Sequence, residues 1–427
     1  MDEKRRSRRD FLQNIAIVLL SLSAVVLIAF SQLYTLSGEN GYVRKLLSPP
    51  TQTGEQAAAP GAELDVPVRV AVSGAYGRYG SVTMVTSDET FRPLESLLAE
   101  ALGSARGYTA CEQTEFLAAL DSSSVYYDFL SALPLSVLAD RMGSAVDSSL
   151  TARRLILSDQ GSNGVRLYIQ DERGICQTCS TAVSRSDLDA AVGRYEQGNA
   201  VFAFDLLETE PASRDIDPFS LLLTETPQDL SVLQASDALT DTDALLTALR
   251  FNPRTNYRYP ESNGAEVVVE GERSLRIQPD GTVLYRSGGE AALTVDAADP
   301  NAPTALEAIS GTASLLGRLP GTSGAATLYL QSIYQNTTSS VLRFGYQVGG
   351  VPIRFSDGTC AAEITLTGST VSTMSLRFRQ YTASGTAPLL LPLRQALAIA
   401  ARSAGAGLSI GYVDSGASTV SPCWLAD

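Results

Sequence analysis

The sequence contains no histidine, and lysine occurs only as Lys4 and Lys45. Without histidine there can be no Ser-His-Asp triad, no Cys-His dyad and no zinc site with imidazole ligands. Because no lysine follows residue 45, a Ser-Lys mechanism is excluded from the rest of the chain. A carboxylate pair that cleaves glycosides remains possible, but the 46 acidic residues single out no pair. We therefore predict no catalytic residue, and no motif predicts a cofactor.

Cysteine is also scarce, and its odd number excludes a complete set of disulfides within one chain. Cys176 and Cys179 have the C-x-x-C spacing of a redox or metal site. They lie in a predicted strand, however, where residues three apart point to opposite faces. No second such motif completes a zinc site. We predict that the cysteines are buried thiols and that they form no metal site. The alternative is a local disulfide or a redox role for the C-x-x-C pair. The cysteines are Cys111, Cys176, Cys179, Cys360 and Cys423.

Charged residues are missing from residues 11–38, and this gap predicts a membrane anchor. The 22 residues from Ile15 to Leu36 are predominantly apolar, and a spanning helix needs roughly 20. A basic cluster at residues 4–9 precedes them, so the N-terminus is expected in the cytoplasm and the body outside it. Two alternatives are a cleaved signal peptide, which the lack of an Ala-x-Ala site disfavours, and a twin-arginine export signal, which residues 7–13 resemble. We favour an uncleaved, single-pass anchor.

Three polar residues of this segment form a stripe that is a candidate partner-binding face. At 100° per residue, Asn14, Ser21 and Gln32 lie within about 20° of one another on a helical wheel. Polar side chains can hold helices together inside a membrane. The alternative is that Asn14 and Gln32 simply lie at the two membrane interfaces, where polar residues cost little.

The rest of the chain is acidic, and the formal net charge of the whole chain is −14. This charge disfavours binding to nucleic acid and to anionic lipids or wall polymers. Composition and pattern divide the chain into a cytoplasmic tip with anchor, a flexible linker, an N-terminal α+β domain, a middle region of one helix plus strands, and a C-terminal α+β domain. These five regions span residues 1–38, 39–66, 67–235, 236–300 and 301–427, in that order.

Hydrophobic periodicity predicts an α+β body of antiparallel sheets with helices packed on one face. Helices are expected over 91–105, 186–195, 240–250, 303–319 and 391–404. Strands are expected between them, including 200–207 and one long strand over 370–382. The opposite face of the C-terminal sheet is expected to be polar, solvated or partner-binding, with Gln331, Ser332, Arg343, Arg377 and Arg379 on it.

Two blocks of the sequence resemble a known family. They are LRFNPRTNYRYPESNGAEVVVEGERSLRIQPDGTVLYR at 249–286, and FGYQVGGVPIRF together with LPLRQALAIAARSAGAGLSIGYVDS and the closing Pro422-Cys423-Trp424. Both are similar to segments of the YycH/YycI family, membrane-anchored regulators of the WalK/WalR two-component system in Gram-positive bacteria. Residues 67–235 match the family only in position and in their richness in strands.

The resemblance implies a non-catalytic role in signal transduction at the cell membrane. The expected partner is a sensor histidine kinase in the membrane, contacted by the anchor and the extracellular body, and a related paralogous regulator is a further possible partner. Two alternatives remain open: an anchored cell-envelope hydrolase with a carboxylate pair, and a passive module that binds the cell wall.

Overall fold

The computed structural model describes residues 66–426, except 75–76, 85–88, 147–148, 196–197, 225–229, 240, 256, 289–291, 322 and 387–388. The chain divides into two compact units, Met1–Ala58 and Ala59–Asp427, and the described residues belong to the second. The predicted anchor and its candidate contact residues Asn14, Ser21 and Gln32 lie outside the described residues. Within the described part, no helix has the length and apolarity that a membrane span requires.

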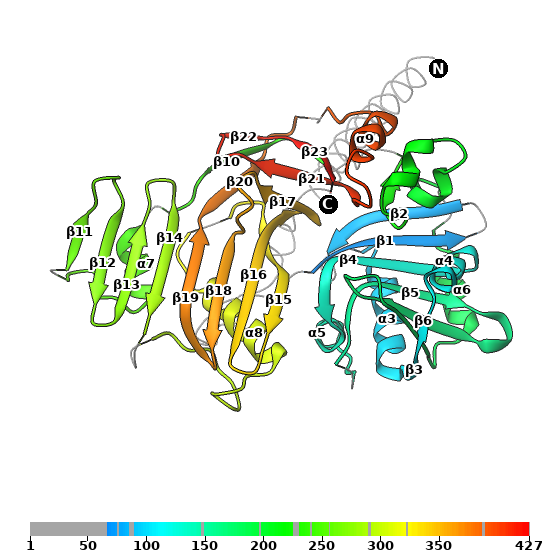
Figure 1. Cartoon of the computed structure of the whole chain (residues 1–427), viewed down its shortest axis with the longest axis horizontal. Coiled ribbons are helices and arrows are strands. Elements are labelled where there is room, and N and C mark those ends of the chain that lie inside the picture. The colour runs from blue at the N-terminus through cyan, green and yellow to red at the C-terminus, as the bar shows by residue number, and fades with distance from the viewer. Residues whose placement is uncertain are drawn as a thin grey trace, which may run out of the picture. The chain divides into compact units, whose positions relative to one another are not determined.

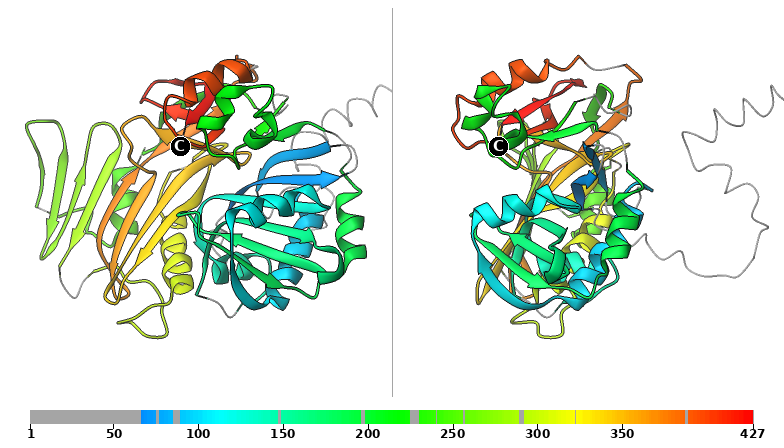
Figure 2. Two further views of the ribbon diagram at one scale, coloured as in Figure 1. Left: turned by 45° about the vertical axis from the view of Figure 1, so that its right-hand side comes forward. Right: turned by 90° about the vertical axis from the view of Figure 1, so that its right-hand side faces the viewer.

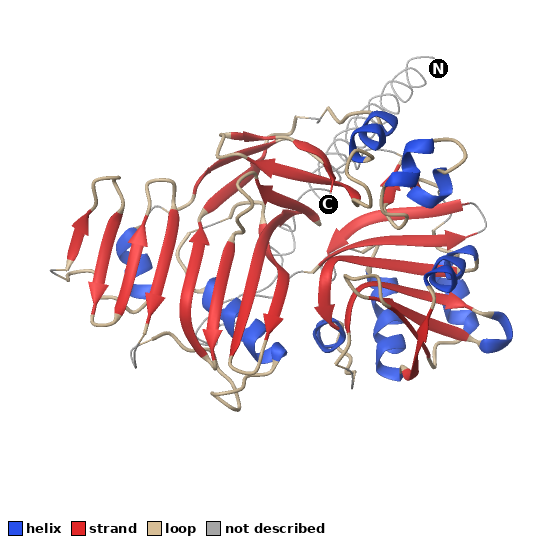
Figure 3. Cartoon of the chain, in the orientation of Figure 1, coloured by secondary structure: helices blue, strands red, loops and turns tan. Residues whose placement is uncertain are grey.

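Strands dominate the described part of the chain, as Figure 3 shows. The predicted α+β class with mostly antiparallel sheets is confirmed. Seven α-helices and three sheets are present among the described residues, and only one strand pair there is parallel, β17 (Val351–Phe355) with β21 (Leu408–Asp414).

The first sheet has nine strands and is built from residues 67–223 (Figure 1). Its order is β3-β7-β6-β5-β4-β1-β2-β8-β9, and each neighbouring pair is antiparallel. Strands β5 and β6 form a hairpin around residues 160–164. The strands are β1 Pro67–Gly74, β2 Gly77–Met84, β3 Arg106–Cys111, β4 Ser124–Pro134, β5 Thr151–Asp159, β6 Val165–Gln170, β7 Cys176–Ser180, β8 Ala200–Phe202 and β9 Leu221–Leu223.

Both faces of this sheet are covered. In β4, Val125 and Tyr127 pack into the core beneath α3 (Arg92–Ser104), α5 (Leu135–Arg141) and α6 (Arg185–Val192), while Tyr126 points into a separate cluster on the other face. There it meets Phe116 from α4 (Gln113–Ala118). The expectation that helices pack on one face is therefore wrong for this sheet. The reason is that its central strands are apolar on both sides, so both faces need a cover.

The second sheet contains eleven strands and joins the middle and C-terminal regions. Strand β14 pairs with β19, so the light-green strands in Figure 2 continue edge to edge into the orange ones, across the predicted boundary at residue 300. Beyond β21 and β17, its strands are β11 Arg258–Pro260, β12 Glu266–Glu270, β13 Arg273–Ile277, β14 Thr282–Ser287, β15 Thr327–Gln335, β16 Ser339–Val348, β18 Ala362–Thr367, β19 Thr370–Arg377 and β23 Pro422–Ala426.

Helices α7 (Thr242–Ala248) and α8 (Ala305–Gly317) share the main core with this sheet. Each helix begins where a side chain satisfies free backbone N–H groups. The Asp241 carboxylate accepts from Ala244 N at 2.8 Å, and Thr304 forms a reciprocal capping box with Glu307. These local signals explain why both helices lie close to their predicted positions.

A small third sheet consists of β20 (Arg379–Ala383), β10 (Leu233–Asp237) and β22 (Thr419–Val420), with β10 in the middle. The strand predicted over 370–382 is therefore wrong as a single element. It divides at Phe378 into β19 and β20, which belong to different sheets. The strand predicted over 200–207 is likewise shorter, since β8 gives way to a 3-10 helix at Ala203–Leu206.

The end of α7 contains a backbone conformation that L-residues rarely adopt. Arg250 has a φ of 62°, in the left-handed region that normally requires glycine. The next residue, Phe251, donates its N–H to Leu246 O at 2.8 Å, and Arg250 N donates to Thr247 O at 3.0 Å. These two bonds are a Schellman motif, in which the residue at this position is usually glycine. Arg250, whose side chain is exposed, therefore adopts this backbone conformation at a cost in conformational free energy.

We predict that Arg250→Gly raises the free energy of unfolding by about 1 kcal/mol, because glycine adopts this conformation without a Cβ penalty. Urea denaturation followed by circular dichroism measures the change. The matched control is Arg250→Ala, which removes the guanidinium but keeps the Cβ and should not stabilise the protein. If both variants behave alike, backbone strain at Arg250 is not the cause.

Candidate functional site

The described residues offer no group of three or more His, Cys, Asp or Glu side chains that could hold a metal ion. A carboxylate-pair hydrolase needs two carboxyl groups lying together, one of them with a raised pKa. Burial raises the pKa of Glu95, on α3, but the charged groups that act on it are Arg141 and Arg92. Two arginines beside one carboxylate are not the environment of such a pair.

A polar hollow of about 540 Å³ lies beside β1, β2 and α6. Its cation, Arg78, is already occupied: the guanidinium donates to Asp205 at 2.9 Å, to Ser73 Oγ at 2.6 Å and to Leu120 O at 2.9 Å. It also lies over the ring of Phe202 at 5.0 Å. Because Asp205 neutralises the positive charge, this hollow provides no free cation for an anionic ligand.

The most exposed apolar surface of the described residues lies near the C-terminus. Leu389 is 99% exposed, Ile399 52% and Leu391 49%. Burying a leucine or isoleucine side chain usually stabilises a protein by about 1.5–3 kcal/mol, so three such side chains in water mark a surface suited to a partner. We call this surface the apolar groove. It holds a cavity of about 170 Å³, lined by Leu389, Leu390, Leu391, Ala396, Ile399, Ala400, Leu408, Pro422, Cys423, Trp424 and Ala426.

The walls of the apolar groove are α9 (Leu393–Ala400) and the edge strand β23. Helix α9 buries Leu397 and Ala400 while leaving Ile399 toward solvent. The indole N–H of Trp424, on β23, donates to Leu391 O at 2.8 Å. This bond fixes the backbone at Leu391, just before α9, against β23.

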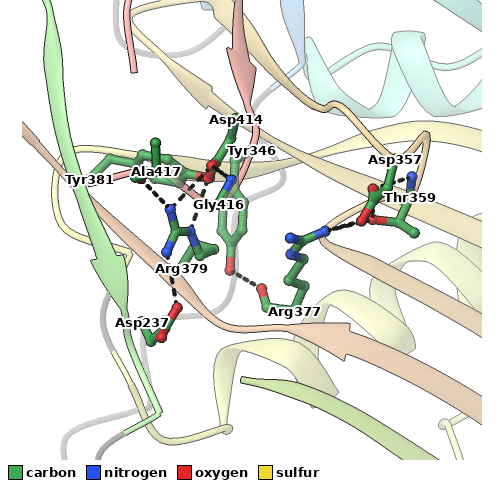
Figure 4. A network of polar contacts seen from close by, with 10 residues as sticks. All are labelled: Asp237, Tyr346, Asp357, Thr359, Arg377, Arg379, Tyr381, Asp414, Gly416 and Ala417. Atoms are coloured by element: carbon green, nitrogen blue, oxygen red, sulfur yellow. Dashed lines mark hydrogen bonds and ion pairs between the residues drawn. The ribbon is translucent and has the colours of Figure 1, made fainter. Parts of the chain in front are cut away.

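A buried ion pair joins Arg379 on β20 to Asp414 at the end of β21 (Figure 4). The Arg379 guanidinium donates from Nε to Asp414 Oδ2 at 2.9 Å and from Nη2 to Oδ1 at 3.1 Å, a two-pronged geometry. It also donates to Asp237 on β10 at 2.9 Å and to Ala417 O at 2.9 Å. One arginine thus ties together three strands and the loop that leads to β22.

Asp414 is fully buried, yet its carboxylate is well supplied with donors. Besides Arg379, the Tyr381 hydroxyl donates to it at 2.8 Å and Gly416 N at 2.7 Å. Burial alone would raise the pKa of Asp414, but these hydrogen bonds outweigh burial and lower it below its ordinary value. The carboxylate therefore stays charged, and the loop that begins at Asp414 is held by its own first residue.

The polar sheet face that the sequence predicts is only partly present. Arg343 lies exposed and pairs with Glu363 at 2.6 Å, as expected of a solvated face. Arg377 instead lies over the Phe355 ring at 4.3 Å and pairs with Asp357. Arg379 is 4% exposed, so its placement on a solvated face is wrong. The reason is the break at Phe378, which turns Arg379 into the small third sheet beside Asp414.

No protein-family model, curated protein or solved structure matches the chain. The apolar groove therefore has to be interpreted from its own residues. Two of its segments, 391–404 and the closing Pro422-Cys423-Trp424, belong to the sequence blocks that resemble the YycH/YycI family. The sequence alone does not show that they lie together. The available signal was the run of three leucines at 389–391, too short for a buried helix and followed by Pro392.

We predict that Asp414→Asn lowers the free energy of unfolding by about 3 kcal/mol at pH 7, because the buried Arg379 then keeps only the exposed Asp237 as a counter-charge. The folded-state pKa of Asp414 is lowered, so the stabilisation is present above the unfolded pKa of about 4 and is lost as pH falls through the folded value. The gap between wild type and variant should therefore be largest near neutral pH and shrink as the pH falls below about 4. Urea titrations across this range measure it.

The matched control is Asp357→Asn, which removes the partner of Arg377 at a half-exposed position. It should cost less than about 1 kcal/mol, as surface ion pairs usually do. Equal losses in the two variants, or a gap that does not change with pH, would contradict a special role for the buried pair.

Proposed function

We propose that this protein is a membrane-anchored extracytoplasmic regulator that controls a sensor histidine kinase by direct contact, with the apolar groove as the contact surface of its body. The observation that carries the proposal is the combination of exposed leucine and isoleucine side chains with a firmly held frame. The resemblance of residues 249–286 and of the C-terminal segments to the YycH/YycI family supports the same role.

The chemistry of the apolar groove selects the occupant. Its lining is almost entirely aliphatic, with the half-buried Trp424 as its one aromatic residue. Aromatic and aliphatic side chains that enter such a pocket carry most of the binding energy at protein interfaces. The overall charge of −14 disfavours nucleic acid and anionic lipid as occupants. We therefore assign the groove to an apolar segment of the kinase's extracytoplasmic domain.

The predicted helix at 15–36 would keep the body at the membrane and raise its effective concentration near the kinase. Its stripe of Asn14, Ser21 and Gln32 supplies a second contact, between helices inside the membrane. In this arrangement the anchor brings the two proteins together, and the groove sets the state of the kinase.

We predict that Leu389→Glu combined with Ile399→Glu weakens binding to the extracytoplasmic domain of the proposed partner kinase at least about tenfold, because charged groups replace apolar ones in the contact. Isothermal titration calorimetry with the two purified proteins measures the change. Stability should be unchanged, since both side chains are exposed in the unbound protein.

The matched control is Tyr334→Glu, a substitution at an apolar side chain that is 68% exposed on β15, outside the groove. It should leave binding unchanged. Tight binding by the groove variant, or equal loss in the control, contradicts the groove as the contact surface. Binding to isolated cell wall instead of the kinase would favour a passive wall-binding module.

The anchor generates a separate prediction. Protease added to intact cells should remove the body and leave a short membrane-bound fragment, because everything after residue 38 is expected outside. Immunoblotting for tags at the two ends detects the fragments, with a cytosolic protein as the control for cell lysis. Recovery of the intact chain in the cytosolic fraction would refute the anchored topology.

A further inference from the structure

Two cysteines far apart in the sequence lie opposite each other in the first sheet. Cys111 is the last residue of the edge strand β3, and its partner across the antiparallel pair is Cys176, the first residue of β7. Residues paired in this way have Cα atoms about 4.5–5.5 Å apart, which lies within the range of natural disulfides. The register thus gives the two Cα atoms a separation that a disulfide can bridge.

The side chains point toward each other. Cys176 belongs to the buried cluster around Phe116 and Tyr168, Cys111 packs against that cluster, and the two thiols are close enough to shift each other's pKa. Cys179 points into the main core on the opposite face. The C-x-x-C spacing is therefore incidental, and the partner of Cys176 comes from another strand.

The two thiols have different surroundings, and this difference suits a stepwise reaction. Cys111 is half-buried at the edge of the sheet, so an external reagent can reach it, while Cys176 is buried. Gln170 donates an N–H to the Cys176 sulfur at 3.4 Å and is itself held by Arg154 at 3.0 Å. This donor lowers the pKa of the Cys176 thiol, but burial outweighs it and raises that pKa above its ordinary value. Burial raises the pKa of Cys111 to about 12, so the reduced pair reacts slowly at neutral pH.

We propose that Cys111 and Cys176 form a reversible disulfide that staples the edge strand β3 to β7. In the first step the Cys111 thiolate attacks a low-molecular-weight disulfide, forming a mixed disulfide and releasing one reagent thiolate. In the second step the Cys176 thiolate attacks the Cys111 sulfur, forming the bond between them and releasing the second reagent thiolate. The two protons lost by the cysteines pass to the two released thiolates, and the reagent disulfide is the species reduced.

The proposed disulfide lies at the edge of the nine-stranded sheet. Strand β3 pairs only with β7 in the order of the sheet, its side chains are mostly exposed, and its register is irregular between Arg106 and Thr109. A covalent bond at its end would fix both the edge and the start of α4. The oxidising conditions expected outside the cytoplasm would favour the bond, but the inference does not depend on the kinase or on the groove.

The test uses the full chain purified under reducing conditions and then incubated with oxidised glutathione. We expect peptide mass spectrometry to find Cys111 linked to Cys176, and denaturing alkylation to leave only Cys179, Cys360 and Cys423 free. The midpoint of thermal unfolding should rise by roughly 10 °C and return to its starting value with dithiothreitol.

Cys111→Ser should abolish both the link and the thermal shift, whereas Cys360→Ser, at another half-buried cysteine, should leave both intact. Alkylation of the wild-type chain serves as a second measurement if Cys111→Ser folds poorly. A link between Cys176 and Cys179, or glutathione retained on Cys111 without transfer to Cys176, would overturn the proposal. If the groove variants fail to affect kinase binding, the proposed Cys111–Cys176 disulfide is not contradicted.

Discussion

The buried pair of Arg379 and Asp414 is the constraint on which the arrangement of the C-terminal strands depends. Removing two charges from water costs several kcal/mol for each ion, and only good geometry with further hydrogen bonds offsets this cost. Here the carboxylate receives donors from Arg379, Tyr381 and Gly416, and the guanidinium also reaches Asp237. Strands from two sheets therefore meet at one fixed point, since shifting either would leave a buried charge unpaired.

This rigidity bears directly on the apolar groove. A loosely held run of leucines would collapse onto the nearest apolar surface, because exposure of each side chain is unfavourable. Leu391 is instead held by the Trp424 indole through its own carbonyl, and β23 is paired to β21, the strand that ends in Asp414. A hydrogen bond thus fixes the backbone at Leu391 while its side chain stays exposed.

The first sheet shows the same dependence on register. Alternation in β4 sends Val125 and Tyr127 to one core and Tyr126 to the other. A slip of one residue in β7 would exchange the faces of Cys176 and its neighbours and would move its thiol away from Cys111. The pairing of the two cysteines is therefore a consequence of the buried side chains on both faces and not of the cysteines themselves.

The sequence by itself determined the class of fold and most element positions, because these follow from contacts within a few residues. The caps at Asp241 and Thr304 are local signals of this kind. Only the tertiary structure decided that residues 370–382 divide between two sheets, that Arg379 is buried, that Cys111 faces Cys176 and that Leu389 lines a groove with Trp424. Those outcomes depend on strands that pair across long stretches of chain, and a single sequence carries no periodic or capping signal for the identity of a distant partner.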